Sequence, residues 1–195
     1  NENNVVYEKY YGGLTYDENE EGVTEISMYD LASLTKVIAT TSAVMKLFDK
    51  GIIDLDANVS EYLPEFAANG KENVTVRNLL LHNSGLKAWM PFNQFCSSRN
   101  EVVETIMNTS LEYETGKNYV YSDLNFITLG LVIEKITRTS LSDYCNAEIF
   151  EPLNMKNTTF TPSDIKHIPP TEYDGSWRKR LLKGEVHDEA ASLME

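Results

Sequence analysis

The sequence predicts an α+β fold that is rich in helix. At least five stretches have the apolar spacing and end signals of helices, whereas only Val5–Tyr11 is rich in the β-branched and aromatic residues of a strand. After Asn154 the chain takes on the composition of loops. A half-buried opening strand needs sheet neighbours. We therefore expect one N-terminal strand or hairpin, whose sheet neighbours this sequence does not visibly supply.

Length and composition indicate one globular domain. The 195 residues are 42% hydrophobic and 24% charged, which is enough to bury a core. Seventeen basic and thirty acidic residues give a net charge of −13, which disfavours nucleic acid or an anionic membrane surface as a partner. The basic run at 177–180 is interpreted as a solvated surface segment. Because residues 1–4 do not resemble a natural start, we expect the chain to be cut at the front.

Cysteine and histidine spacing predicts neither a metal nor a cofactor. Cys96 and Cys145 are far apart and lack Cys-x-x-Cys spacing, and the histidines form no ligand pattern with them. The two cysteines could form one disulfide or none.

Helices are expected from periodicity and end signals at residues 32–50, 59–63, 75–82, 100–107, 123–137 and 141–150. Ser122 and Ser140 are the expected N-caps of the last two. The first helix has one apolar stripe, formed by Ile38, Thr41, Met45 and Phe48. The stripe predicts that this helix is buried and central.

The first candidate catalytic residues are Ser33 and Lys36, whose side chains share one face of the first expected helix. A serine hydroxyl needs a base to take its proton, and a lysine helps only if its surroundings favour the neutral amine or relay the proton. Burial of Lys36 would favour the neutral amine. Ser33 would also lie at the positive end of the helix. Taken alone, the pattern also fits a helix start followed by an exposed lysine.

His82 has two interpretations. It lies at an expected helix end beside the turn at Gly85, where a histidine either takes part in catalysis or makes a structural hydrogen bond. We favour the structural interpretation.

Three motifs together resemble the serine β-lactamase and penicillin-binding-protein superfamily, nearest to its class C β-lactamase and esterase-like branch. They are Ser33-Leu34-Thr35-Lys36, Leu81–Leu86, and Tyr121-Ser122-Asp123 with the residues that follow to 130. More closely, residues 29–36 and 182–188 resemble the β-lactamase-like domain fused to a family 3 glycoside hydrolase in some Bacteroidetes proteins. The resemblance covers nearly the whole chain.

The resemblance implies a β-lactamase/transpeptidase-like fold, of which residues 1–195 would form a partial domain. This part is mainly the helical domain, without the first strand and the C-terminal strands that carry a third motif. The resemblance assigns Ser33 as the acylated nucleophile, Lys36 as its proton-transfer partner and Tyr121 as the base, which Lys36 would keep charged. The alternative for Tyr121 is a core tyrosine. Asp123 occupies a motif position that is often asparagine in the family. A carboxylate cannot donate an amide N–H to a substrate carbonyl.

Two functions are compatible with these residues. The first is a serine hydrolase that acts on an ester, a β-lactam or a D-alanyl peptide through an acyl-Ser33 intermediate, in the periplasm or outside the cell. The second is a non-catalytic domain that binds cell-wall fragments or supports a fused glycoside hydrolase. The expected partners are a small-molecule or peptidoglycan-derived substrate and no nucleic acid. The missing third motif predicts that this stretch alone is inactive.

Overall fold

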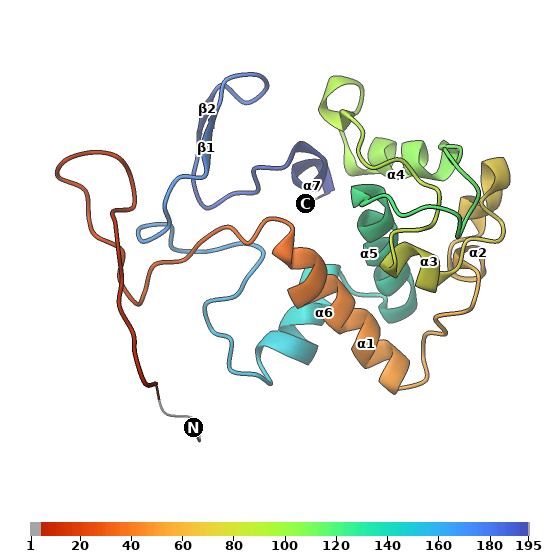
Figure 1. Ribbon diagram of the computed structural model, residues 1–195, viewed down its shortest axis with the longest axis horizontal. Helices are drawn as coiled ribbons and strands as arrows, with labels where there is room; N and C mark the ends of the chain where they lie inside the picture. Colours follow the sequence, from red (N-terminus) through yellow and green to blue (C-terminus); the bar gives the residue numbers. More distant parts are fainter. Residues whose placement is uncertain (1–4, 195) are drawn as a thin grey trace. The chain divides into compact units, whose positions relative to one another are not determined.

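The computed structural model describes residues 5–194, which divide into two compact units (Figure 1). One unit joins the described residues up to Leu31 with Thr161–His187. The other joins Ala32–Phe160 with the described residues from Asp188 onward. Within the described range, no helix is long and apolar enough to cross a membrane.

The helices belong to the larger unit. They are a π-helical segment (Lys36–Thr41), α1 (Ser42–Asp49), α2 (Val59–Tyr62), α3 (Val76–Leu80), α4 (Arg99–Asn108), α5 (Asp123–Thr137), α6 (Leu141–Cys145), a second π-helical segment (Asn146–Phe150) and α7 (Glu189–Met194). Short 3-10 segments occupy Pro64–Gly70 and Phe92–Gln94. Thr75, Ser122 and Ser140 each cap a helix by accepting a backbone N–H from three residues ahead. The expected starts of α5 and α6 are thereby confirmed.

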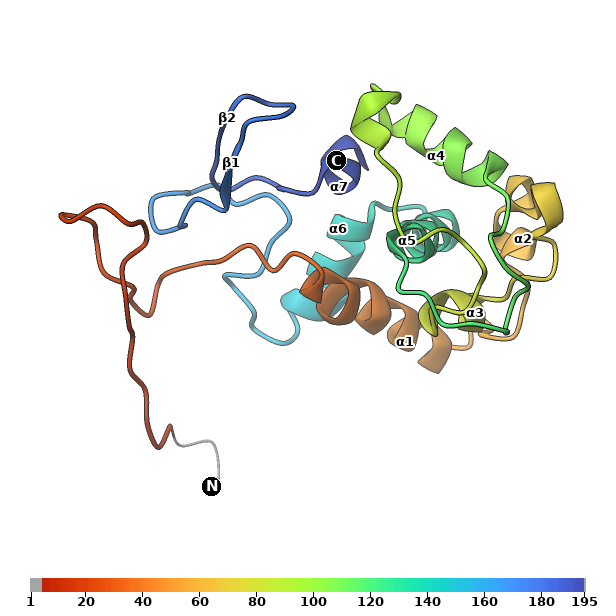
Figure 2. The same ribbon diagram turned by 45° about the horizontal axis from the view of Figure 1, so that its top comes forward.

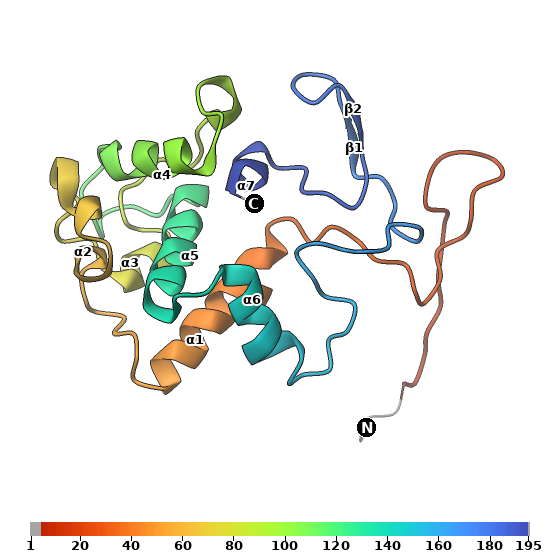
Figure 3. The ribbon, with the colours of Figure 1, turned by 180° about the vertical axis from the view of Figure 1, so that it is seen from behind.

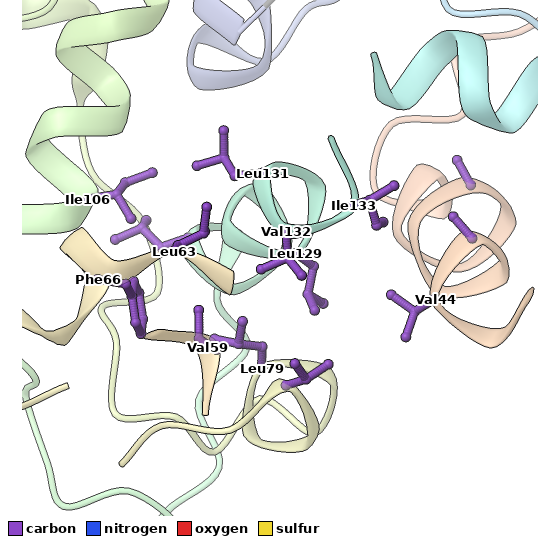
Figure 4. Close-up of a cluster of buried hydrophobic side chains, with 14 of the residues drawn as sticks. Val44, Val59, Leu63, Phe66, Leu79, Ile106, Leu129, Leu131, Val132 and Ile133 are labelled. Atoms are coloured by element: carbon purple, nitrogen blue, oxygen red, sulfur yellow. The ribbon is translucent and has the colours of Figure 1, made fainter. Parts of the chain in front are cut away.

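Helix α5 is the centre of the larger unit. Helices α1, α2, α3 and α6 all pack against it, and Figures 2 and 3 show it surrounded by them. The core formed there draws on most elements of the unit (Figure 4): Val44, Val59, Leu63, Phe66, Leu79, Ile106, Leu129, Leu131, Val132 and Ile133. The prediction that the helix after Ser33 is the central one is therefore wrong, because α5 buries more of its circumference.

The helix that follows Ser33 also buries a different face from the expected one. Met45 and Phe48 are 65% and 52% exposed, and the buried residues are Ala39, Thr40, Ala43, Val44 and Leu47. These buried residues repeat at intervals of four, so the segment has two faces with helical spacing, and packing against α5 selects the buried one.

The only sheet among residues 5–194 lies in the smaller unit. Strands β1 (Glu172–Asp174) and β2 (Arg180–Leu182) pair antiparallel, with Tyr173 opposite Leu181 (Figure 1). No strand forms at Val5–Tyr11, although an isolated bridge between Gly13 and Gly22 makes the N-terminal stretch hairpin-like. β-Propensity reflects packing against a neighbouring strand. That is why composition alone misplaced the strands and why the expected loop after Asn154 contains them.

The basic run is only partly solvated. The Arg178 side chain is 10% exposed and donates to the Asp174 carboxylate, with Nε and Oδ2 3.0 Å apart. Backbone N–H groups of Trp177 and Arg178, together with this guanidinium, hold the pKa of Asp174 well below its usual range. Arg178 therefore anchors the β1–β2 turn, and is not part of a free cationic surface.

Candidate active site

Ser33 lies where the chain enters the long helix. Ala32 has a positive φ of 45°, a conformation that costs an L-residue about 1–2 kcal/mol and that clusters at functional sites. The backbone N–H of Lys36 then donates to the Ser33 carbonyl over 3.1 Å, which starts the helical turns. The Ser33 side chain is exposed. This position gives Ser33 the positive end of the helix that the sequence analysis expected.

The Lys36 ammonium joins the residues of this site. Its Nζ lies 3.2 Å from the Ser33 hydroxyl and 2.7 Å from Asp123 Oδ1. The same nitrogen lies 5.1 Å from the centre of the Tyr121 ring. In the structure, therefore, Ser33, Asp123 and Tyr121 all lie near the Lys36 amine nitrogen, so the four residues predicted for the site are close together. The Asp123 and Lys36 side chains are 27% and 16% exposed, so their ion pair is partly shielded from water.

The surroundings keep Lys36 charged. Burial lowers the pKa of its amine, but hydrogen bonds to Asp123 and Tyr121 and the charges on these groups outweigh burial, so that the net pKa is raised. Burial thus acts in the expected direction, but the partners of Lys36 outweigh it and the amine stays charged. An ammonium has no lone pair, so Lys36 donates to the Ser33 oxygen and cannot accept its proton.

Tyr121 is not a core tyrosine, because 45% of the residue is exposed. The loop that carries it is fixed to a neighbouring segment. The Ser122 hydroxyl donates to the Lys87 carbonyl over 2.6 Å, and the Asp123 N–H donates to the Ala88 carbonyl over 2.8 Å. Tyr121 and Asp123 are thereby held at the start of α5 beside Lys36.

A buried polar network, which the sequence analysis missed, lies behind this loop. His82 accepts the Ser122 N–H at Nδ1 over 3.0 Å, and Ser84 donates to Asn125 Oδ1 over 2.6 Å. Asn125 and Ser122 are fully buried and Ser84 nearly so. The signal available in the sequence was their position in the second and third motifs. The structural interpretation of His82 as a hydrogen-bonding residue is confirmed.

No group of His, Cys, Asp and Glu side chains in the described part of the chain is arranged to hold a metal ion. Cys96 and Cys145 are free and buried. Burial raises the pKa of the Cys145 thiol to about 11, so this thiol stays protonated and unreactive at neutral pH.

Comparison of the sequence with known proteins gives a match to the Beta-lactamase family model over residues 1–191. A relative in Salmonella agona (strain SL483), named "Putative D-alanyl-D-alanine carboxypeptidase", is 34% identical over 212 residues, which cover 95% of this chain and 49% of the relative. A protein of the same name in Salmonella typhi gives the same figures. The chain spans about half the length of these relatives.

Solved structures resemble the chain over most of its length. FmtA from Staphylococcus aureus matches with a TM-score of 0.76 and 22% identity over 94% of this chain and 51% of the other. A class C β-lactamase mutant matches with a TM-score of 0.75 and 22% identity over 94% and 50%. A penicillin-binding protein homologue from Pyrococcus abyssi matches with a TM-score of 0.74 and 26% identity over 93% and 44%.

Proposed function

The chain belongs to the Beta-lactamase family, and from this premise we propose that the full-length protein is a serine hydrolase that acts through an acyl-Ser33 intermediate. The predicted β-lactamase/transpeptidase-like fold is confirmed by the family match and the structural likenesses. The observation that carries the proposal is the Lys36 ammonium, 3.2 Å from the Ser33 hydroxyl and paired with Asp123.

Because Lys36 is charged, it cannot act as the base in the proposed reaction, and this role falls to Tyr121. Tyr121, as the proposed base, takes the proton of Ser33 while the serine oxygen attacks the carbonyl carbon of the substrate. Lys36 stabilises the negative charge that passes between these two oxygens, and Asp123 keeps Lys36 protonated. When the carbonyl re-forms, the bond to the leaving group breaks and Tyr121 returns the proton to that group. Water then hydrolyses the acyl-Ser33 ester by the same route.

The proposed substrates are an ester, a β-lactam or a D-alanyl peptide. The name of the Salmonella relatives supports the D-alanyl peptide. Asp123 supports an ester instead, because a carboxylate cannot donate the N–H that an asparagine would offer to an amide carbonyl. A peptidoglycan-derived substrate would place the protein in the periplasm or outside the cell.

The alternative is a non-catalytic domain that binds cell-wall fragments or supports a fused glycoside hydrolase. The open setting of the site is the observation that favours it, because Ser33 and Tyr121 are exposed and water weakens electrostatic stabilisation of a transition state.

We expect the 195-residue stretch by itself to turn over substrate barely above background. The resemblance places one of the two oxyanion-hole N–H donors on the strand that carries the third motif, and loss of one such donor costs about 10²–10³-fold in rate.

The test compares Ser33→Ala with Ser42→Ala in the full-length gene product that contains this chain. Ser42 lies on the same run of helix, and its hydroxyl donates to the Val37 carbonyl over 3.1 Å. With a nitrophenyl ester, a chromogenic cephalosporin and a D-alanyl-D-alanine peptide as substrates, we expect Ser33→Ala to lose about 10³-fold or more in kcat. The control variant should stay within about threefold of the unchanged protein, since hydroxyl deletions away from the chemistry have small effects. Equal activity of both variants would favour the binding domain.

A further inference from the structure

His82 occupies a backbone position that suits other residue types better. It follows the C-terminus of α3 with a φ of +55°, where glycine or asparagine is the usual residue because a branched side chain crowds the backbone. The residue is nonetheless buried, at 8% exposure. This conformation costs an L-residue about 1–2 kcal/mol, which the buried contacts of the His82 ring offset.

The hydrogen bonds define which ring nitrogen carries the proton. A backbone N–H can only donate, so the Ser122 N–H at 3.0 Å requires that Nδ1 of His82 accepts and that the proton of the neutral ring is on Nε2. Asn125 Nδ2 lies 3.4 Å from the same Nδ1. The Ser84 hydroxyl donates to Asn125 Oδ1, which turns the amide N–H₂ towards the imidazole. Nδ1 therefore faces two donors.

The ring of His82 also packs against the side of the active site. Its centre lies 4.6 Å from that of the Tyr121 ring and 5.1 Å from that of the Phe126 ring, with interplanar angles of 35° and 33°. Lys36 Nζ lies 5.1 Å and 5.9 Å from the centres of the same two aromatic rings. One imidazole thus contacts the tyrosine ring and holds the backbone of the next residue, Ser122.

We propose that His82 is a positioning residue, which in its neutral form accepts the Ser122 N–H and so holds Tyr121 at Lys36 and Ser33. The inference rests on the proposed function of Tyr121 as the base. Its consequence is a site that fails on acidification. A proton on Nδ1 would make this nitrogen a donor directed at the Ser122 N–H. The loop that carries Tyr121 would then lose the anchor next to Tyr121 and keep those at Lys87 and Ala88.

Burial, with the charge of Lys36, favours the neutral form of the His82 ring. Burial and the Lys36 ammonium both lower the pKa of His82, and the Asp123 carboxylate opposes them with a smaller effect. The other titratable side chains that face the ring are the phenols of Tyr119 and Tyr121. The neutral form therefore persists to a lower pH than for an ordinary histidine, and the loss is expected below pH 6.5, the unperturbed histidine value.

Two substitutions separate hydrogen bonding from packing. In His82→Asn, Oδ1 takes the place of Nδ1, because both atoms are bonded to Cγ, and asparagine tolerates the positive φ. In His82→Phe, the ring contacts remain but the acceptor is lost. In the full-length gene product we expect His82→Asn to keep kcat/KM within about threefold at pH 7.5, whereas His82→Phe loses about 10–100-fold in kcat with little change in KM.

The pH profile and amide exchange test the same claim. The unchanged protein should lose activity below pH 6.5, and His82→Asn, which cannot titrate, should lack that acid limb. Hydrogen exchange at the Ser122 N–H should stay slow in His82→Asn and become faster in His82→Phe. The inference is overturned by an unchanged acid limb in His82→Asn, by full kcat in His82→Phe, by equal losses in both, or by equal Ser122 exchange.

Failure of the proposed function is distinguishable from failure of this inference. If Ser33→Ala leaves activity unchanged, the role of Ser33 is wrong, while the exchange of the Ser122 N–H still decides whether His82 holds the loop. A purely structural His82 would lower the thermal unfolding midpoint in both variants and leave the pH profile as it was.

Discussion

At the scale of residues, the Lys36 ammonium is the group that the other candidate site residues contact. Burial alone lowers the pKa of Lys36, which is the direction that favours a neutral amine and that the sequence pattern led us to expect. Asp123, 2.7 Å from Nζ, reverses that outcome and raises the pKa instead. The motif spacing correctly brought Ser33 and Lys36 together. The charge state was not predictable, because it depends on the balance between desolvation and a partner nearly ninety positions away in the sequence.

Asp123→Asn should lower the pKa of Lys36. The substitution removes the charge of the closest partner while burial, the largest single cause, stays in place. The pKa can be measured from the Lys36 side-chain NMR signal in the full-length protein, and the alkaline limb of the pH–rate profile should move to lower pH with it.

Asp56→Asn is the matched control, because Asp56 pairs with Arg77 on the surface, with an oxygen 2.6 Å from Nε. That variant should leave the Lys36 pKa and the pH–rate profile unchanged. A Lys36 pKa that Asp123→Asn does not move, or that it raises, would contradict the account of the charge state.

At the scale of elements, local sequence signals predicted where helices begin more accurately than they predicted the buried face of a helix or the positions of the strands. N-caps such as Ser122 and Ser140 act within one turn, so their side chains marked the starts of α5 and α6 from the sequence alone. The buried face of α1 was mispredicted because the segment has two faces with helical spacing, and packing against α5, which is distant in sequence, selects between them. The strands were misplaced because pairing depends on residues distant in sequence.

Gly85→Ala should disrupt the turn that carries the second motif. Gly85 has a φ of +96°, and a Cβ there would lie 2.3 Å from the Tyr113 carbonyl oxygen. We expect a loss of about 3 kcal/mol or more in the free energy of unfolding, since backbone strain and a steric overlap combine. Urea unfolding of the full-length protein measures it.

Gly116→Ala provides the comparison. Its φ is +84°, but a Cβ there would meet no atom within 4 Å, so only the cost of the conformation remains, about 1–2 kcal/mol. If the two substitutions destabilised the protein equally, close approach at Gly85 would not be the reason for glycine in this motif.

At the scale of the whole molecule, three separated motifs meet in the larger unit. The turn after α3 supplies His82, the start of α5 supplies Asp123, and the helix entry supplies Ser33. The spacing within each motif predicted which residues lie together, because each motif is local. It did not predict the buried contacts among His82, Ser84, Ser122 and Asn125, because these join segments about forty positions apart.

The central claim is that Ser33 forms a covalent acyl intermediate in the full-length protein. The most direct measurement is mass spectrometry after the protein is mixed with a β-lactam or a nitrophenyl ester and quenched in acid, followed by peptide mapping. The account predicts an acyl adduct on the peptide that contains Ser33, formed with the unchanged protein and with Ser42→Ala but not with Ser33→Ala. An adduct on another residue, or no adduct while substrate is being hydrolysed, would contradict it.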